Sequence, residues 1–273
     1  MQSSKEHKHR SEAEQRQSPA GGIVYRAIYA EGKEELSRDS DALAWSGLAA
    51  GLAMGMSLLT EALLRAHLPD TGWRPLIAKL GYGVGFLLVI LGRQQLFTEN
   101  TLTVILPLLR LKRAAILVNV LRLWSVVLAA NIVGALLLSG AIARLPVVDP
   151  LVKEAATAIG MEAMSHGFMT VLVRGIFAGW LIAMMVWLLP FAESGRVWVI
   201  LIVTYVVGLA GFAHVIAGTA EAFVLSWQGL ESWPATLGGY MVPSLIGNTI
   251  GGVALVAAIA HVQYIEGTET QDL

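Results

Sequence analysis

The chain has 273 residues, of which 55% are hydrophobic and only 14% are charged, and its formal net charge is −1. Soluble domains carry about 25% charged residues, so this composition excludes an ordinary soluble domain and indicates an integral membrane protein. The near-zero charge gives no indication of a nucleic-acid partner. The sequence contains no cysteine, which excludes disulfides, thiolate nucleophiles and cysteine-ligated metals.

The N-terminal region is polar and falls into two predicted parts. Residues 1–21 are rich in Ser, Gln, Glu, Lys and His, a composition typical of a disordered tail, and they do not resemble a secretory signal. Residues 22–41 predict an amphipathic helix on the membrane surface, with Val24, Tyr25 and Ile28 facing lipid. A plain solvated helix is the alternative for this segment.

Six apolar segments follow, and we expect each to be a helical membrane span. Lipid admits only helices or closed barrels, and these segments are continuous over roughly 20 residues or more rather than alternating over about 10. The predicted spans are 43–66, 75–110, 113–142, 167–190, 196–228 and 234–262, in a channel domain at 42–264, and the longest outside loop is 143–166.

The distribution of basic residues predicts the orientation of the chain. An even number of spans places both termini on one side. The basic tail and the Arg110, Lys112, Arg113 cluster share that side, which the positive-inside rule assigns to the cytoplasm. We therefore expect a multi-pass protein of the cell inner (plasma) membrane, with residues 265–273 forming a cytoplasmic C-terminal tail.

The second and fifth spans are interrupted by glycines and polar residues. The first interruption runs from Gly92 to Asn100, and the second runs from Gly211 to Gly218 and contains His214. Interrupted spans in matching places of two halves point to a transport site at the membrane midplane. The order intact, broken, intact occurs twice, and three spans per half predict inverted repeats. The expected fold is thus all-α, with six transmembrane helices in two inverted three-helix repeats.

Small residues and buried charges add two expectations. Glycines four apart, at Gly47/Gly51, Gly175/Gly179 and Gly247/Gly251, predict close helix packing. Ionisable residues inside a membrane are usually paired. We expect Arg93 and Glu99, which flank the first interruption, to brace it by an internal salt bridge, and Glu221 to act similarly at the second. Lining of a pore by Glu221 or Arg174 is the alternative.

The turns at the two interruptions resemble those of a known family. Leu96-Phe97-Thr98 follows a glycine in span 2, and Gly211-Phe212-x-His214 lies in span 5. With six spans and an N-terminal helix, this pattern is similar to the formate/nitrite transporter family over about residues 25–263. The version from Gly92 to Asn100 looks most like the divergent YfdC-like branch.

The resemblance implies an aquaporin-like fold, assembled as a homopentamer with one pore in each subunit. In such proteins two loops meet beside the pore, and apolar rings lie above and below a central histidine. The residues that match this plan are His214, Thr98, Phe97, Leu96, Phe212, Tyr82, Phe86 and Val207.

The sequence departs from the family pattern at several positions. Gln95 and Ala213 replace residues that are often acidic, Gly179 stands where an asparagine is usual, and the vestibule lysine falls at Ala163. Arg174, Glu162 and Lys153 are the candidates for a vestibule in its place. These differences bear on the choice of solute more than on the channel fold.

The central histidine suggests a mechanism. A charged solute at the bilayer centre costs several kcal/mol, on the order of 3 or more, and a weak acid lowers this cost by crossing in its neutral form. Histidine exchanges protons near neutral pH, so His214 would pass a proton to an arriving anion. The alternative is that His214 only holds the loop backbone. Thr98 is its expected partner, and capping of the half-helix near Glu99 is the alternative role of Thr98.

The predicted function is a channel or transporter for small monovalent anions or their conjugate weak acids. A pore for a small neutral solute, or a non-conducting membrane sensor or scaffold, is the alternative. The sequence lacks a His-Glu-x-x-His motif and a Gly-x-Ser-x-Gly elbow, so we expect no enzyme activity, cofactor or metal. The N-terminal surface helix is the candidate gate. The expected partners are the solute, the lipid bilayer and further copies of the chain.

Overall fold

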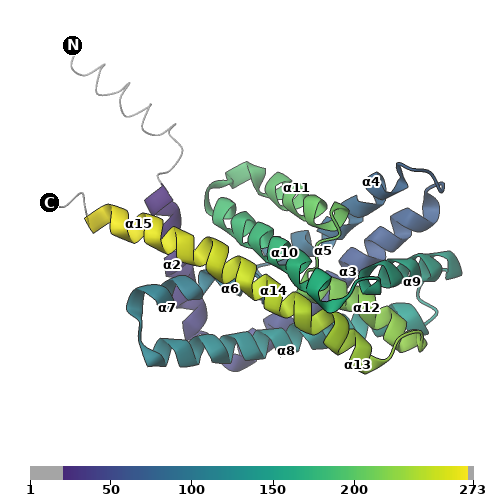
Figure 1. Ribbon diagram of the computed structural model, residues 1–273, viewed down its shortest axis with the longest axis horizontal. Coiled ribbons are helices and arrows are strands. Elements are labelled where there is room, and N and C mark those ends of the chain that lie inside the picture. Colours follow the sequence, from purple (N-terminus) through teal and green to yellow (C-terminus); the bar gives the residue numbers. More distant parts are fainter. Residues whose placement is uncertain (1–20, 270–273) are drawn as a thin grey trace, which may run out of the picture.

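The computed structural model describes residues 21–269, and every regular element in this range is a helix (Figure 1). The predicted tails lie largely outside the described residues. The first half contains α2 (Gly21–Ser37), α3 (Ser40–His67), α4 (Arg74–Ala78), η1 (Lys79–Tyr82), α5 (Gly83–Leu91), α6 (Asn100–Thr103), α7 (Ile105–Leu111) and α8 (Ala114–Arg144). The second half contains α9 (Pro150–Met164), α10 (Phe168–Leu188), η2 (Leu189–Phe191), η3 (Glu193–Gly195), α11 (Arg196–Leu209), α12 (Val215–Gln228), α13 (Trp233–Thr236), η4 (Leu237–Met241), α14 (Val242–Gly252), η5 (Val253–Ala258) and α15 (Ile259–Glu269).

Five helical stretches of the described chain are long and apolar enough to cross a membrane. They are Ser40–His67, Arg74–Leu91, Ala114–Arg144, Phe168–Phe191 and Trp233–Tyr264. The predicted second span is divided, because α6 and α7 continue after the interruption that follows α5. The predicted fifth span consists of α11 and α12, which have 14 residues each. Neither half reaches the roughly 20 residues that cross the hydrocarbon core alone.

The helices pack in two long pairs, α3 along α8 and α10 along α14. Glycines allow the close approach in both pairs. A Cβ atom on Gly51 would collide with the backbone of Asn131 in α8, and one on Gly179 would collide with the backbone of Asn248 in α14. The glycine spacing therefore predicts the packing correctly, because only a residue without a side chain leaves room for the neighbouring backbone.

Two predictions about the periphery are wrong. The segment 143–166, expected as a loop, contains helix α9, whose Val152, Ala156 and Ile159 are buried. In α2, Tyr25 and Ile28 do not face outward to lipid but lie in the protein core, with 3% and 0% of their surface exposed. Both helices are held by apolar contacts with the rest of the chain.

The molecule has two distinct ends along its long axis. Helices α2, α7 and α15 gather at one end, and α4, α9 and α13 lie at the other (Figure 1). Contacts of α2 with α7 and α15 agree with this arrangement. The two interruptions lie between these ends and bring distant parts of the sequence together, as the buried contacts below show.

Candidate functional site

The two interruptions have the same backbone geometry. Where α5 ends, the Gln94 N–H donates to the Val89 carbonyl at 2.9 Å, and where α11 ends, the Phe212 N–H donates to the Val207 carbonyl at 3.0 Å. This bond across five residues is the hallmark of a Schellman helix end.

Each of these helix ends requires a left-handed residue. Gly211 takes this conformation with φ of 63° without steric penalty, whereas Arg93 takes it with φ of 50° despite its side chain. A non-glycine residue in this region is uncommon. The cost at Arg93 is therefore balanced by the contacts that hold the first interruption.

Asn131 of α8 holds the first interruption. Its side-chain oxygen accepts from the Phe97 N–H at 2.9 Å, and its amide nitrogen donates to the Gln95 carbonyl at 2.9 Å and the Gly47 carbonyl at 2.7 Å. Asn131 is fully buried. One amide thus satisfies two backbone groups that the broken helix leaves without partners and ties them to α3.

Asn248 of α14 holds the second interruption in the same way. It accepts from the Val215 N–H at 2.8 Å and donates to the Ala213 carbonyl at 2.7 Å and the Gly175 carbonyl at 2.9 Å. Neither asparagine was among the predicted site residues. The available signal was an amide side chain inside an apolar span, at Asn131 and Asn248.

The two interruptions meet at one hydrogen bond, between Thr98 Oγ1 and His214 Nε2 at 2.9 Å, and both residues are fully buried. His214 also begins α12, because its Nδ1 accepts from the Ala217 N–H at 3.2 Å. A neutral imidazole whose Nδ1 accepts carries its proton on Nε2. The imidazole therefore donates to Thr98. His214 thus contacts its expected partner and also holds the backbone at the start of α12.

Aromatic and apolar residues surround this bond. Phe86 lies edge-on to the His214 ring, with centroids 5.0 Å apart, and Tyr82 lies next to Phe86 at 5.6 Å. Val207 and Leu96 are fully buried. Phe97 packs against Trp124, with ring centroids 5.5 Å apart. Seven of the eight predicted pore residues are thus buried between the two ends, whereas Phe212 is only partly buried and stacks on Phe177.

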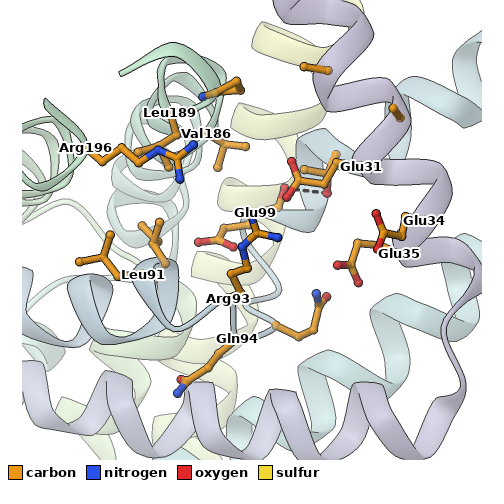
Figure 2. Close-up of a pocket in the computed structure, with 16 residues that line it drawn as sticks. Glu31, Glu34, Glu35, Leu91, Arg93, Gln94, Glu99, Val186, Leu189 and Arg196 are labelled. Atoms are coloured by element: carbon orange, nitrogen blue, oxygen red, sulfur yellow. Dashed lines mark hydrogen bonds between the residues drawn. The ribbon is translucent and has the colours of Figure 1, made fainter. Parts of the chain in front are cut away.

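A cavity of about 480 Å³ opens on the α2 side of this region (Figure 2). Glu31, Glu34 and Glu35 reach it from α2, and Glu99 and Arg93 reach it from the first interruption. Arg196, at the start of α11, extends into the same space. We call it the α2-side cavity.

The position of Glu31 in this cavity perturbs its carboxyl group. Partial burial by the cavity walls raises the pKa of Glu31 above its ordinary value of 4.5, and the neighbouring charges of Glu35 and Glu34 act in the same direction, whereas Arg93 and Arg196 oppose them. The protonated form of Glu31 is therefore favoured when α2 is docked.

A second cavity, of about 350 Å³, opens on the side of α9, and we call it the α9-side cavity. Of the predicted residues, Tyr82, Phe212, Glu162 and Arg174 line it, whereas Lys153 is not among its lining residues. It is also lined by Lys79, Glu221 and Tyr240. The sequence predicted no such position for Lys79 or Tyr240, and a pore-lining Glu221 was only the alternative.

The ion pairs differ from those expected. Arg93 and Glu99 form no salt bridge with each other, and Glu99 Oε1 is buried without a hydrogen-bond partner. Instead, Lys79 Nζ pairs with Glu61 at 2.5 Å on the α9 side. The hydrogen bonds of Asn131 take over the bracing predicted for the Arg93–Glu99 pair. Within residues 21–269, no group of three or more acidic, His or Cys side chains is placed to hold a metal ion.

Comparisons with known proteins agree with this architecture. The sequence profile of the family described as Formate/nitrite transporter matches residues 23–262. The inner membrane protein YfdC of Escherichia coli (strain K12) is 36% identical over 240 residues, which cover 88% of this chain and 77% of YfdC.

Solved structures show the same fold. An FNT family ion channel superimposes with a TM-score of 0.74 at 19% identity, covering 86% of this chain and 96% of the other. A pentameric formate channel with formate bound superimposes with a TM-score of 0.65 at 18% identity, covering 83% and 98%.

These features define a helical membrane protein of the channel or transporter class, with interrupted helices meeting between two cavities. The chain belongs to the formate/nitrite transporter family. This family consists of transporters and channels and not of enzymes.

Proposed function

We propose that the protein is a channel or transporter for small monovalent anions or their conjugate weak acids. The observation that carries the proposal is the buried Thr98–His214 hydrogen bond, which joins the two interruptions between two cavities. The name of the formate-bound structural relative supports a small carboxylate as one solute.

The proposed architecture has six spans in two inverted three-helix repeats. The matched contacts of Asn131 and Asn248 support it, since each ties an interruption to the first helix of its own half. The shared Schellman geometry at Gln94 and Phe212 supports it further. In this arrangement α11 and α12 together form the fifth span.

The proposed assembly is a homopentamer in an inner membrane, with one pore in each subunit. The titles of the pentameric structural relative and of the inner membrane relative support this assembly and location. The α2 side faces the cytoplasm, as the basic residues of the termini predict. Residues 1–20 and 270–273 would then be cytoplasmic tails, and α2 would be a surface helix docked at the pore mouth.

In the proposed mechanism, a solute crosses the buried centre in neutral form. The barrier for an ion is high there because Phe86, Val207 and Leu96 offer no polar group. His214 and Thr98 present a hydrogen-bonded pair to the solute. An arriving anion favours the imidazolium form of His214, which forms by taking up a proton from water, and transfer of that proton to the anion leaves a neutral imidazole and a neutral acid. His214 capping of α12 keeps the imidazole ring in place during this exchange.

One observation favours a second candidate, a pore for a small neutral solute. Ala163 stands at the position of the family's vestibule lysine, and Lys79, which lines the α9-side cavity, is engaged by Glu61. An anion would find no free ammonium there.

Flux into proteoliposomes distinguishes these functions. Formate, nitrite, hydrosulfide, acetate and water are offered between pH 5 and 8, and the wild type is compared with His214→Asn. The control is His166→Asn, because His166 lines the α9-side cavity but is bonded to the neighbouring Ser165.

We expect small anions to pass and His214→Asn to abolish the pH dependence of their flux, with no effect of His166→Asn. Passage of water or another neutral solute alone would establish the second candidate. Intact pentamers without any flux would indicate a membrane sensor or scaffold and refute the transport proposal.

A further inference from the structure

Glu221 is a buried carboxyl group without a dedicated partner. It lies on α12, seven residues after His214, which places it on the same helix face about 10 Å away. Only 8% of its surface is exposed, and the exposed part lines the α9-side cavity. Within residues 21–269 it forms no hydrogen bond and no ion pair.

The cations near Glu221 are engaged by other groups. Lys79 binds Glu61 at 2.5 Å, and Arg65 binds Glu162 at 2.6 Å. The Arg174 guanidinium donates to the Gly211 carbonyl at 3.4 Å. The titratable or charged groups that face Glu221 from the surrounding elements are Glu61, Lys79, Tyr82, Glu162, Arg174 and Tyr240.

A carboxylate in this position is poorly compensated. Burial of an ionised carboxylate without a partner is unfavourable, and binding of a proton removes this cost. The cavity gives the group a route to water. His214 is less free, because its Nδ1 holds the start of α12 and its Nε2 is bonded to Thr98.

We propose that Glu221 exchanges protons with the permeating solute in the α9-side cavity and so determines the charge form in which the solute crosses. This inference rests on the transport function proposed above. The protonation state of Glu221 thus affects which form of the solute crosses. An ionised Glu221 repels an anion, whereas a protonated Glu221 converts the anion to its neutral acid.

The proton transfer is balanced. The O–H bond of the Glu221 carboxyl breaks, an O–H bond forms on the solute anion, and the products are a carboxylate and a neutral acid. The carboxylate then recovers a proton from water on the α9 side. For a solute leaving through this cavity, the same steps run in reverse.

The test is the flux of formate and nitrite through the full-length protein in proteoliposomes at equal pH on both sides, between pH 5 and 8. The variants are Glu221→Gln, which cannot exchange a proton, and Glu221→Asp, which keeps the carboxyl. Glu154→Gln is the control, because Glu154 is an exposed carboxyl group on α9 that does not line the cavity.

In the wild type we expect a shallow pH dependence, since Glu221 supplies protons inside the cavity. In Glu221→Gln a solute that enters from the α9 side loses this proton source before it reaches His214, so acid that is already neutral in bulk solution dominates entry from that side. Its flux should therefore be about tenfold lower at pH 7 and should fall about tenfold for each pH unit. Glu221→Asp should restore the shallow profile, and Glu154→Gln should leave it unchanged.

Two results would overturn the inference while the transport function stands. One is a Glu221→Gln profile that superimposes on that of the wild type, and the other is a profile of the same shape at a lower rate, which indicates a structural role. If Glu221→Gln does not assemble, a steep profile in Glu221→Asp would also contradict the proposal. Absence of flux in the wild type would instead refute the proposed function itself.

Discussion

At the scale of single residues, the buried polar side chains divide into those that hold the backbone and those that face the cavities. Asn131 and Asn248 belong to the first group, because each bonds to two backbone groups of one interruption and to one carbonyl of a neighbouring intact helix. Thr98 and His214 meet between the interruptions, and Glu221 faces a cavity. Asn131 and Asn248 thus hold the backbone, whereas Glu221 is placed to contact a solute in the cavity.

The first prediction concerns the two asparagines. Asn131→Ala or Asn248→Ala leaves one N–H and one carbonyl group of the interruption without their partner. Each buried unpaired group costs about 1–3 kcal/mol, so either substitution should lower the free energy of unfolding by roughly 2 kcal/mol or more, measured as a loss of Tm in detergent. Asn119→Ala, also on α8, is the control, because Asn119 has no hydrogen bond among the described residues. Equal Tm values for all three variants would contradict the bracing role.

The second prediction concerns the Glu61–Lys79 pair. Lys79→Met leaves the Glu61 carboxylate, with 1% of its side chain exposed, without its cation. Loss of one partner of a buried pair destabilises by about 3–5 kcal/mol, whereas replacement of both is often neutral. The double variant Lys79→Met/Glu61→Met should therefore unfold at a higher temperature than Lys79→Met alone. A double variant less stable than the single one would show that the ion pair itself contributes stability.

At the scale of elements, the interruptions were visible in the sequence but the contacts that hold them were not. Glycines and polar residues at 92–100 and 211–218 reveal the breaks because such residues are rare in apolar spans. The asparagines bond to residues far away in the chain, so spacing alone does not identify their partners. Residues 143–166 were predicted only as a loop between two spans, although Val152, Ala156 and Ile159 follow the spacing of a helix face.

The third prediction concerns the α10–α14 contact. A Cβ atom on Gly251 would collide with the Ile176 carbonyl and would lie 2.6 Å from the Trp180 nitrogen. Gly251→Ala should thus force the helices apart and lower the free energy of unfolding by about 1–3 kcal/mol. Gly238→Ala, with no atom within 4 Å of the added Cβ, should be neutral or stabilise by up to about 1 kcal/mol. Thermal unfolding of both variants decides between packing and backbone flexibility as the reason for these glycines.

The fourth prediction concerns the docking of α2. Because docking raises the pKa of Glu31, its contribution is fully present below the ordinary value of 4.5 and is lost as pH rises through the raised value. Hydrogen exchange of residues 21–37, corrected for the intrinsic pH dependence, should therefore become faster over that range. Glu31→Gln should remove the change, and α9 provides the internal control. An unchanged pH response in Glu31→Gln would exclude Glu31 as the sensor.

At the scale of the whole molecule, many large apolar side chains remain exposed along the long helices. Trp45, Leu121, Leu137 and Ile202 are between 52% and 73% exposed. Lipid or neighbouring subunits would cover such residues. The exposed apolar surface of the single chain is therefore covered only in a membrane and, in the proposed assembly, partly by neighbouring subunits.

The fifth prediction is the size of that assembly. Native mass spectrometry of the protein released from detergent should give a species of five times the 29.2 kDa of one chain. The homologous fold of the pentameric structural relative is the reason for this expectation. Any other dominant stoichiometry would refute the pentamer and leave the fold of the single chain untouched.

The two cavities also shape the electric field across the protein. On the proposed function, each cavity would admit conducting solution into the molecule, from the α2 side and from the α9 side. The membrane voltage would then fall mainly across the layer that contains Thr98 and His214. A monovalent anion that crosses this layer gains or loses about 2.3 kcal/mol for every 100 mV. A neutral acid that crosses the same layer does not respond to voltage. A flux of neutral acid would therefore carry no electrical current.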